Sequence, residues 1–191
     1  MSNACARRVG LSALAALLAA IVTGPATAAE ETIRAFAAWQ GSGRTLPTGP
    51  DEATFTGTID GTVYVDTDKG PIESGRLACP AMVVINLADA TQTGTAHCTI
   101  TARDGARVFG ELTCKGVYLV GCNGDFTLTG GTDRFAGITG GGKATVRSSS
   151  REFAATAATA GVQESATGII FWPELKYTLP EPPAPATSTS P

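Results

Sequence analysis

The sequence contains a single histidine, His97, and none of the short motifs that would give it a catalytic or metal-binding partner. A Ser-His-Asp triad needs an imidazole base, but no G-x-S-x-G motif supplies the nucleophile. Zinc sites use closely spaced ligand pairs, and no C-x-x-C pair occurs. We therefore expect neither a triad hydrolase nor a metal site, and no cofactor.

Charged residues are also scarce, at 16% of the chain, and acidic residues outnumber basic ones. Without Arg7 and Arg8, which lie in an N-terminal segment described below, 12 basic residues face 17 acidic ones. Nucleic acids and anionic membrane surfaces both attract a basic protein face. The charge balance therefore predicts no nucleic-acid partner and no attachment to an anionic membrane.

No apolar run is long enough for a membrane-spanning helix. Residues 10–22 are apolar, whereas a helix needs about 20 such residues to cross a bilayer. Two arginines precede this run, and Ala26 and Ala28 follow it with the small-x-small spacing of a cleavage site. These features predict a signal peptide over residues 1–29. The protein is then secreted or periplasmic, without stable membrane insertion after cleavage.

The remaining chain divides near residue 178. Residues 30–178 are roughly 150 residues, which is enough for one domain with a hydrophobic core. Residues 179–191 include five prolines, and such a composition favours an extended, solvated chain. We expect a single domain followed by a disordered tail.

Four cysteines follow the predicted signal peptide, which itself contains Cys5. An even number of cysteines in an exported chain predicts disulfides, and four allow three different pairings. We favour Cys114 with Cys122, which closes a short loop, and Cys79 with Cys98, which joins neighbouring strand regions.

Alternation of apolar and polar residues is the main structural signal. In residues 54–68, Phe55, Ile59, Val63 and Val65 fall on one face of a predicted strand. Residues 81–87 are apolar on both faces, which predicts burial on both sides or a subunit contact. The remaining strands are expected over residues 33–40, 94–101, 107–114, 124–128, 143–148 and 169–177.

The turns between these strands point to an all-β fold. Asp104-Gly105 lies between two β-rich runs and predicts a tight hairpin. Residues 151–161 are alanine-rich enough for a short helix. About eight to ten short strands at this spacing are typical of an antiparallel sandwich or barrel.

Seven glycines lie within residues 124–143, and residues 137–143 nearly match the phosphate-binding motif G-x-x-x-x-G-K-[ST]. Ala144 stands where that motif needs a hydroxyl, and the residues that follow are not helix-forming. We therefore predict a glycine-rich connection in which Phe135 and Ile138 enter the core and the glycines allow the chain to reverse.

Four segments together resemble a known family: "GRLACPAMVVINL", "GTAHCTIT", "CNGDFTLT" and "GGTDRFAGITGGG". They are similar to bacterial secreted proteins with an allene oxide cyclase barrel-like domain, which are similar in turn to plant allene oxide cyclases and dirigent proteins. The resemblance covers residues 53–148, and Asp133 stands where the related motif often has glycine. It implies an eight-stranded antiparallel barrel of the calycin type and a homo-oligomer, trimeric in the plant relatives. It assigns no catalytic residue.

Candidate site residues follow from this barrel. Glu111 is the leading catalytic candidate, because a barrel interior can raise the pKa of a carboxyl group. Asp60, Tyr64 and Tyr118 would join Glu111 if they face the lumen, although the alternation does not decide which face looks inward. The candidates for lining an apolar ligand pocket are Trp39, Phe171 and Trp172.

Three functional hypotheses remain open. The first is a secreted or periplasmic barrel that binds a small hydrophobic molecule or acts non-catalytically in the envelope. The second is a cofactor-independent cyclase or isomerase, favoured by a lumen-facing Glu111 beside Tyr64. The third is an oligomeric surface protein that makes its contact through residues 81–87.

Overall fold

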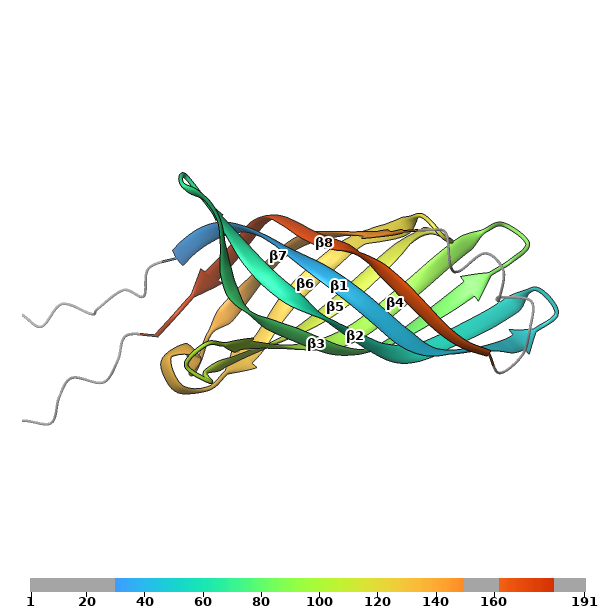
Figure 1. Cartoon of the computed structure of the whole chain (residues 1–191), viewed down its shortest axis with the longest axis horizontal. Helices are drawn as coiled ribbons and strands as arrows, with labels where there is room; N and C mark the ends of the chain where they lie inside the picture. The colour runs from blue at the N-terminus through green and yellow to red at the C-terminus, as the bar shows by residue number, and fades with distance from the viewer. Residues whose placement is uncertain (1–29, 150–161, 181–191) are drawn as a thin grey trace, which may run out of the picture.

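The computed structural model describes residues 30–149 and 162–180, which form a closed barrel of eight antiparallel strands (Figure 1). Each strand pairs with the next along the chain, and β8 closes the barrel by pairing with β1. The elements are β1 (Glu30–Gly49), β2 (Glu52–Thr67), β3 (Gly70–Asn86), β4 (Thr91–Ala102), β5 (Arg107–Val117), β6 (Gly121–Gly131), the 3-10 helix η1 (Asp133–Phe135), β7 (Thr139–Ser148) and β8 (Val162–Thr178). The predicted all-β, eight-stranded barrel is confirmed.

Some of the sequence-based predictions concern residues outside the described ranges. These are the signal peptide over residues 1–29, the short helix over residues 151–161 and the tail beyond residue 180. Leu179, which we assigned to the tail, packs against the barrel core instead.

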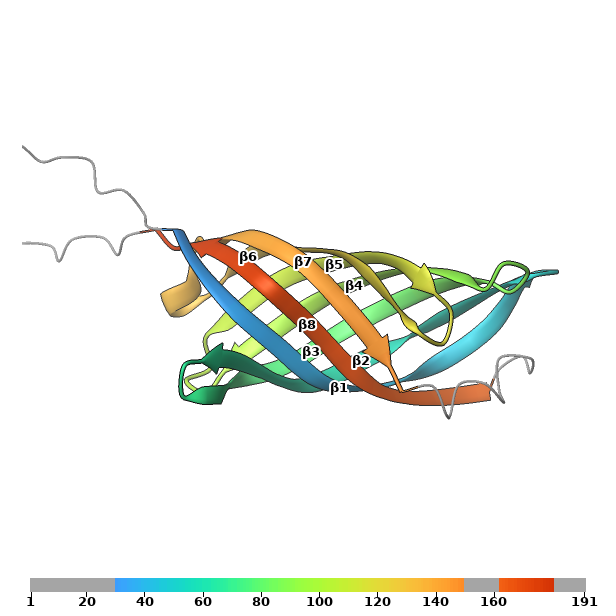
Figure 2. The same cartoon turned by 90° about the horizontal axis from the view of Figure 1, so that it is seen from above.

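The barrel has two ends, which differ in the connections that close them (Figure 2). We call the end where β1 begins and β8 finishes the proximal end; it also carries the β2–β3 and β4–β5 turns and the β6–β7 connection with η1. The opposite, distal end carries the β1–β2, β3–β4 and β5–β6 turns. Because all strands are antiparallel, consecutive connections alternate between these ends.

Strand β2 shows how the sequence pattern builds the wall. Phe55 and Val63 are buried and Ile59 is half-buried against the core, while the alternate residues Thr56, Thr58 and Asp60 are exposed on the other face. The strand runs without a break through Asp60-Gly61, with a register shift between Val63 and Tyr64. The alternation therefore identifies one continuous strand and its inward face.

Several strands extend further than their sequence patterns indicate. Residues 46–49 belong to β1, and β3 begins at Gly70 rather than near residue 81. The cause is the barrel itself, since pairing with a neighbour on each side stabilises strand residues that have weak β propensity.

The glycine-rich segment has a different role from the one we predicted. Residues 140–142 lie within β7 rather than in a turn. Gly140 has a φ of +132°, and a Cβ there would collide with the carbonyl oxygen of Lys176 on β8. Phe135 and Ile138 do pack against the core, as expected. These glycines permit close strand approach, and the following segment is a strand, so no phosphate-binding loop forms.

Both favoured disulfides are present. Cys79 on β3 is bonded to Cys98 on β4, and Cys114 on β5 is bonded to Cys122 on β6. All four side chains are buried in the barrel core. Each bond therefore links two neighbouring strands from inside the barrel.

The middle of the barrel is filled where aromatic rings meet small residues. Phe126 is 1% exposed and packs at 5.3 Å, between ring centroids, from the equally buried Trp172. A Cβ at Gly110 would overlap the Phe126 ring. Glycine at this position of β5 therefore leaves the space that the ring occupies. Elsewhere the interior is rich in alanine, which leaves space toward both ends.

Candidate functional site

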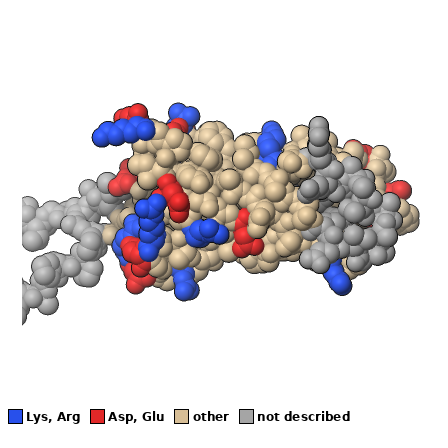
Figure 3. Space-filling view, in the orientation of Figure 1, with Lys and Arg blue, Asp and Glu red and all other residues tan. Residues whose placement is uncertain are grey.

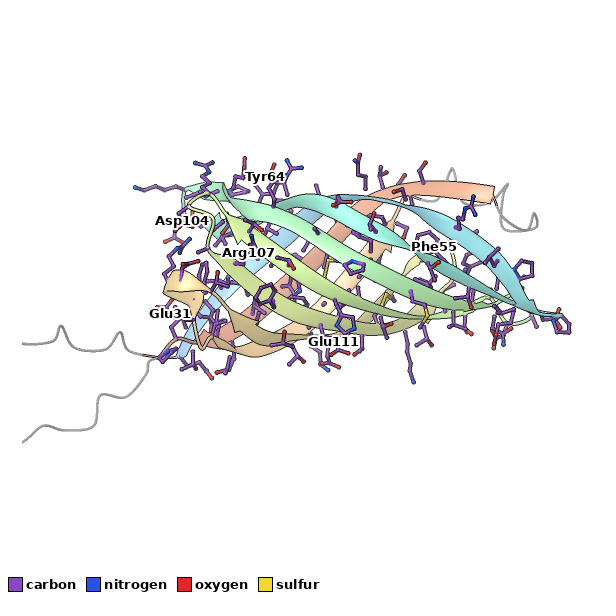
Figure 4. All side chains as sticks on the ribbon, turned by 90° about the horizontal axis from the view of Figure 1, so that it is seen from below. Glu31, Phe55, Tyr64, Asp104, Arg107 and Glu111 are labelled. Carbon is purple, nitrogen blue, oxygen red and sulfur yellow. A yellow bond between two sulfur atoms is a disulfide. The ribbon has the colours of Figure 1, made fainter. Side chains whose placement is uncertain are left out.

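The leading catalytic candidates do not face the lumen. Glu111 is paired with His97 across β4 and β5, on the face opposite the buried Leu112. Asp60 is exposed on β2, and Tyr64 stacks on Phe36 of β1 with ring centroids 5.1 Å apart. In Figure 4, Tyr64 and Glu111 lie far apart on the outside of the barrel. Glu111, Asp60 and Tyr64 therefore lie on the outer face, because the inward face of their strands is the apolar one.

The other candidates divide between the wall and the interior. Phe171 is half-buried and pairs with Phe36, so it belongs to the outer face rather than to a pocket. Trp39, Trp172 and Tyr118 do line cavities inside the barrel. A ligand contact by these three residues stays a prediction.

The larger of two cavities lies at the proximal end and has a volume of about 280 Å³. Its wall is apolar and comes from β1, β2, β4, β5, β6 and β8 together with Phe135 and Ile138 of the β6–β7 connection. Apolar residues of this wall include Ile33, Val63, Ile100, Val108, Leu128 and Leu175. This cavity is the candidate functional site.

Three polar side chains reach the proximal cavity: Ser74, Arg134 and Tyr177. The Nε of Arg134 donates a hydrogen bond of 2.7 Å to Oδ2 of Asp104, which lies in the β4–β5 turn. The hydroxyl of Tyr177 donates to Oε2 of Glu31. Figure 4 shows Asp104 and Glu31 at this end of the barrel. The polar groups thus belong to a rim around an apolar interior.

Two groups at this rim have shifted pKa values. Burial, and then the hydrogen bond to Glu31, raise the pKa of Tyr177 to about 12, so its hydroxyl stays protonated at neutral pH. The hydrogen bond from Arg134, and then one from the Ala106 amide, lower the pKa of Asp104. At neutral pH the rim therefore presents a neutral phenol and a carboxylate that is already hydrogen-bonded.

A smaller cavity of about 100 Å³ lies at the distal end. Its wall includes Trp39, Phe55 and the Cys114–Cys122 bond, and Tyr118 and Leu119 of the β5–β6 turn close over it. Among the described residues, its lining includes no Asp, Glu, Lys or Arg. The two cavities thus differ in size and in charge.

The indole nitrogens are further polar groups of the interior. Nε1 of Trp39 and Nε1 of Trp172 are buried without a hydrogen-bond partner among the described residues. Unpaired buried donors are costly and uncommon. Each cavity therefore has one unsatisfied donor in its wall, carried by one of the chain's two tryptophans.

Charge is concentrated at the proximal end. On the face shown in Figure 3, Lys, Arg, Asp and Glu side chains gather mainly over this end. Ion pairs here include Arg34–Asp66, Arg103–Glu73, Arg134–Asp104 and Lys176–Glu30. Because these pairs are exposed, each contributes little to stability. Their main effect is to surround one cavity with charged groups.

Two further features were searched for within the described ranges. No group of three His, Cys, Asp or Glu side chains in residues 30–149 and 162–180 is arranged to hold a metal ion. No helix in the same part of the chain has the length and apolarity needed to span a bilayer.

Sequence reasoning missed Arg134 and Tyr177. Arg134 lies in the glycine-rich connection, where the glycines and Phe135 drew attention, and Tyr177 lies near the end of the last strand. No local pattern links these two residues. Tyr177 lies on β8, which pairs with its neighbour β7 and closes the barrel against β1. The available signal was an arginine next to an aromatic residue that was predicted to enter the core.

Comparisons with known proteins add little to this geometry. No family model and no curated protein sequence matches the chain. A solved structure, that of a pterocarpan synthase dirigent protein, is similar with 11% identity and a TM-score of 0.33, over 85% of this chain and 97% of that chain. These values support no functional inference. The barrel rests on the strand pairing itself, and the family resemblance of the sequence stays a prediction.

Proposed function

We propose that this chain is an exported protein that binds a small hydrophobic molecule in the proximal cavity of its barrel. The observation that supports this proposal is a cavity of about 280 Å³ whose wall, among the described residues, is apolar except for Ser74, Arg134, Tyr177 and the indole Nε1 of Trp172. Water is held poorly in such a space, because each buried water needs two to four polar partners.

The cavity volume limits the size of the ligand. It corresponds to roughly nine water molecules at ~30 Å³ each, and lies just below the range of about 300–1,000 Å³ for sites that bind drug-sized molecules. Burial of apolar ligand surface contributes about 25 cal/mol per Å² before the costs of association are subtracted. We therefore expect a compact ligand of one or two rings, or a short chain, bound with modest affinity.

The two alternative hypotheses fit the structure less well. The cyclase or isomerase hypothesis was based on Glu111 beside Tyr64 in the lumen, and both residues lie on the outer face. The oligomer hypothesis was based on residues 81–87, of which Met82 is 46% exposed and Ile85 is buried inside the barrel. A subunit contact at Met82 remains compatible with ligand binding in the interior.

The two tryptophans allow a direct test, because one lines each cavity. Trp39→Phe leaves Trp172 as the reporter of the proximal cavity, and Trp172→Phe leaves Trp39 as the reporter of the distal one. We expect titration with the neutral probe 2-naphthamide to change Trp172 fluorescence in a saturable way, with little change in Trp39 fluorescence. A response from Trp39 alone would move the site to the distal end, and no saturable response from either protein would reject the proposal.

A second measurement identifies the natural ligand. Protein exported and purified without detergent would be examined by native mass spectrometry, and any bound molecule would then be released by denaturing extraction. We expect a stoichiometric small apolar molecule. Its loss from Ala102→Phe, which fills the proximal cavity, and its retention in Ala81→Phe, which fills the distal one, would place it.

A further inference from the structure

We propose that the proximal cavity is selective for ligands that join an apolar body to a carboxylate, and that Arg134 binds this carboxylate. This inference rests on the proposed function, and adds the chemical class of the ligand. It depends on the position of Arg134, on how its guanidinium is held and on which of its N–H groups remain available.

Arg134 is positioned at the cavity by two contacts. It lies in η1, and its neighbour Phe135 packs against the core. The Arg134 Cζ atom is 4.1 Å from the centroid of the Phe135 ring, and its Nε is hydrogen-bonded to Asp104. A planar guanidinium held over a ring and bonded at one nitrogen has little freedom to turn. Its orientation is therefore set before any ligand arrives.

The bond to Asp104 uses only one side of the guanidinium. The two terminal nitrogens, Nη1 and Nη2, have no hydrogen-bond partner among the described residues, and Arg134 remains 56% exposed at its side chain. Two parallel N–H groups match the two oxygens of a carboxylate. Arg134 can thus keep its bond to Asp104 while binding a second carboxylate at its free edge.

The other ionisable groups of the rim are compatible with an anion. Asp104 accepts hydrogen bonds from Arg134 and from the Ala106 amide, and Glu31 accepts one from Tyr177. The neighbouring Asp133 accepts one from Thr132. Arg107 is a further exposed positive charge at this end, besides the ion-paired Arg34, Arg103 and Lys176. Each of these carboxylates is already bonded, whereas the terminal nitrogens of Arg134 are not.

The distal cavity provides an internal contrast. The described residues of its lining include polar groups, among them Gln92, Tyr118 and Ser148, but no charged side chain. A carboxylate placed there would lose its hydration without gaining a positive partner. An anionic amphiphile should therefore distinguish the two ends of one barrel.

The test compares 2-naphthoate with 2-naphthamide, which share a ring system and differ in charge. In the Trp39→Phe background, we expect Trp172 fluorescence to report about tenfold tighter binding of the carboxylate, the size expected for a charge-assisted pair at a partly exposed site. Arg134→Gln should remove this preference and leave binding of the amide within about twofold. Arg107→Gln, which removes an exposed arginine at the same end, should keep the preference.

A further variant separates loss of the anion contact from loss of the ion pair. Asp104→Asn removes the partner charge of Arg134 but keeps an oxygen for the Ala106 amide, so the preference for 2-naphthoate should persist or increase. Equal binding of both probes by the parent protein would overturn the inference and leave the proposed function standing. A preference that survives Arg134→Gln would also overturn the inference. Failure of both probes to bind would overturn the inference and the proposed function together.

Discussion

The two ends of the barrel are built from the same eight strands but offer different chemistry. The proximal end has a cavity of about 280 Å³ whose rim carries Arg134. The distal end has a cavity of about 100 Å³ whose lining, in the part of the chain that the structure describes, has no charged residue. The large exposed apolar side chains near the distal turns are Leu46, Leu87, Val117 and Val120. The wall is common to both ends, so the connections determine what each end can bind.

The largest effect on stability should come from a substitution in the packed region between the two cavities. Phe126 lines neither cavity and packs on Trp172 near the middle of β6. Phe126→Ala should lower the free energy of unfolding by about 3–5 kcal/mol, because it removes a fully buried ring. Urea denaturation measures this loss. Phe109→Ala, on the half-exposed outer face of β5, is the matched control, and an equal loss there would show that Phe126 does not separate the cavities.

The distal disulfide should matter to stability and little to the proximal site. Replacing both Cys114 and Cys122 by serine should cost about 2–3 kcal/mol, since the bond closes a short loop. Thermal or urea unfolding measures the cost. Binding of 2-naphthamide at the proximal cavity should be nearly unchanged, and a large loss of that binding would mean that the two ends are coupled.

A smaller effect is expected where Trp39 meets β8. A Cβ at Gly168 would collide with the carbonyl oxygen of Arg147 on β7 and would lie 2.6 Å from Cζ2 of Trp39. Gly168→Ala should therefore displace this indole, shift Trp39 fluorescence and cost about 1–3 kcal/mol through overpacking. Thr167→Val, one residue away on the outer face, should remain within about 0.5 kcal/mol of the parent protein. Unchanged Trp39 fluorescence in Gly168→Ala would contradict the packing described at this end.

The smallest effect should appear only at alkaline pH and only at the proximal end. The pKa of Tyr177 in the folded protein is about 12, above the usual value near 10. Because the unfolded chain releases this proton first, the contribution of Tyr177 is complete below pH 10 and is lost as the pH rises to about 12.

The measurement is urea denaturation of Tyr177→Phe and the parent protein across this range. The difference in unfolding free energy between them should shrink from pH 10 to pH 12. Tyr64→Phe, on the outer face, is the control. A difference for Tyr177→Phe that does not depend on pH would mean that the hydroxyl is not held by burial and Glu31.

The sequence predicts the wall of this barrel better than its interior. Alternation in β2 identifies the inward face, Asp104-Gly105 marks a real turn, and both disulfides follow from compartment and spacing. Alternation in β5 places Glu111 and Leu112 on opposite faces, but it does not decide which of the two looks inward. The burial of Leu112 now assigns Glu111 to the outside.

The rim of the proximal cavity could not be predicted in the same way. Arg134 and Asp104 lie in different connections, and Tyr177 and Glu31 lie on the last and the first strand. The Tyr177–Glu31 contact depends on closure of the barrel by β1 and β8, and the Arg134–Asp104 contact depends on the register of β5 with β6. No local pattern encodes either. Periodicity reports which face of a strand is buried, but not which distant strand lies beside it.

The β1–β8 pairing has a consequence for how the chain can be rearranged. Glu30 pairs with Thr178, so the first and last strands meet at one point of the proximal end. Every other pairing joins strands that are adjacent along the chain. A short linker between these two residues and a new opening at Gly105, in an exposed turn, should therefore give a circular permutant with the same barrel. In that permutant β4 and β5 become the terminal strands, and both cavities keep their walls.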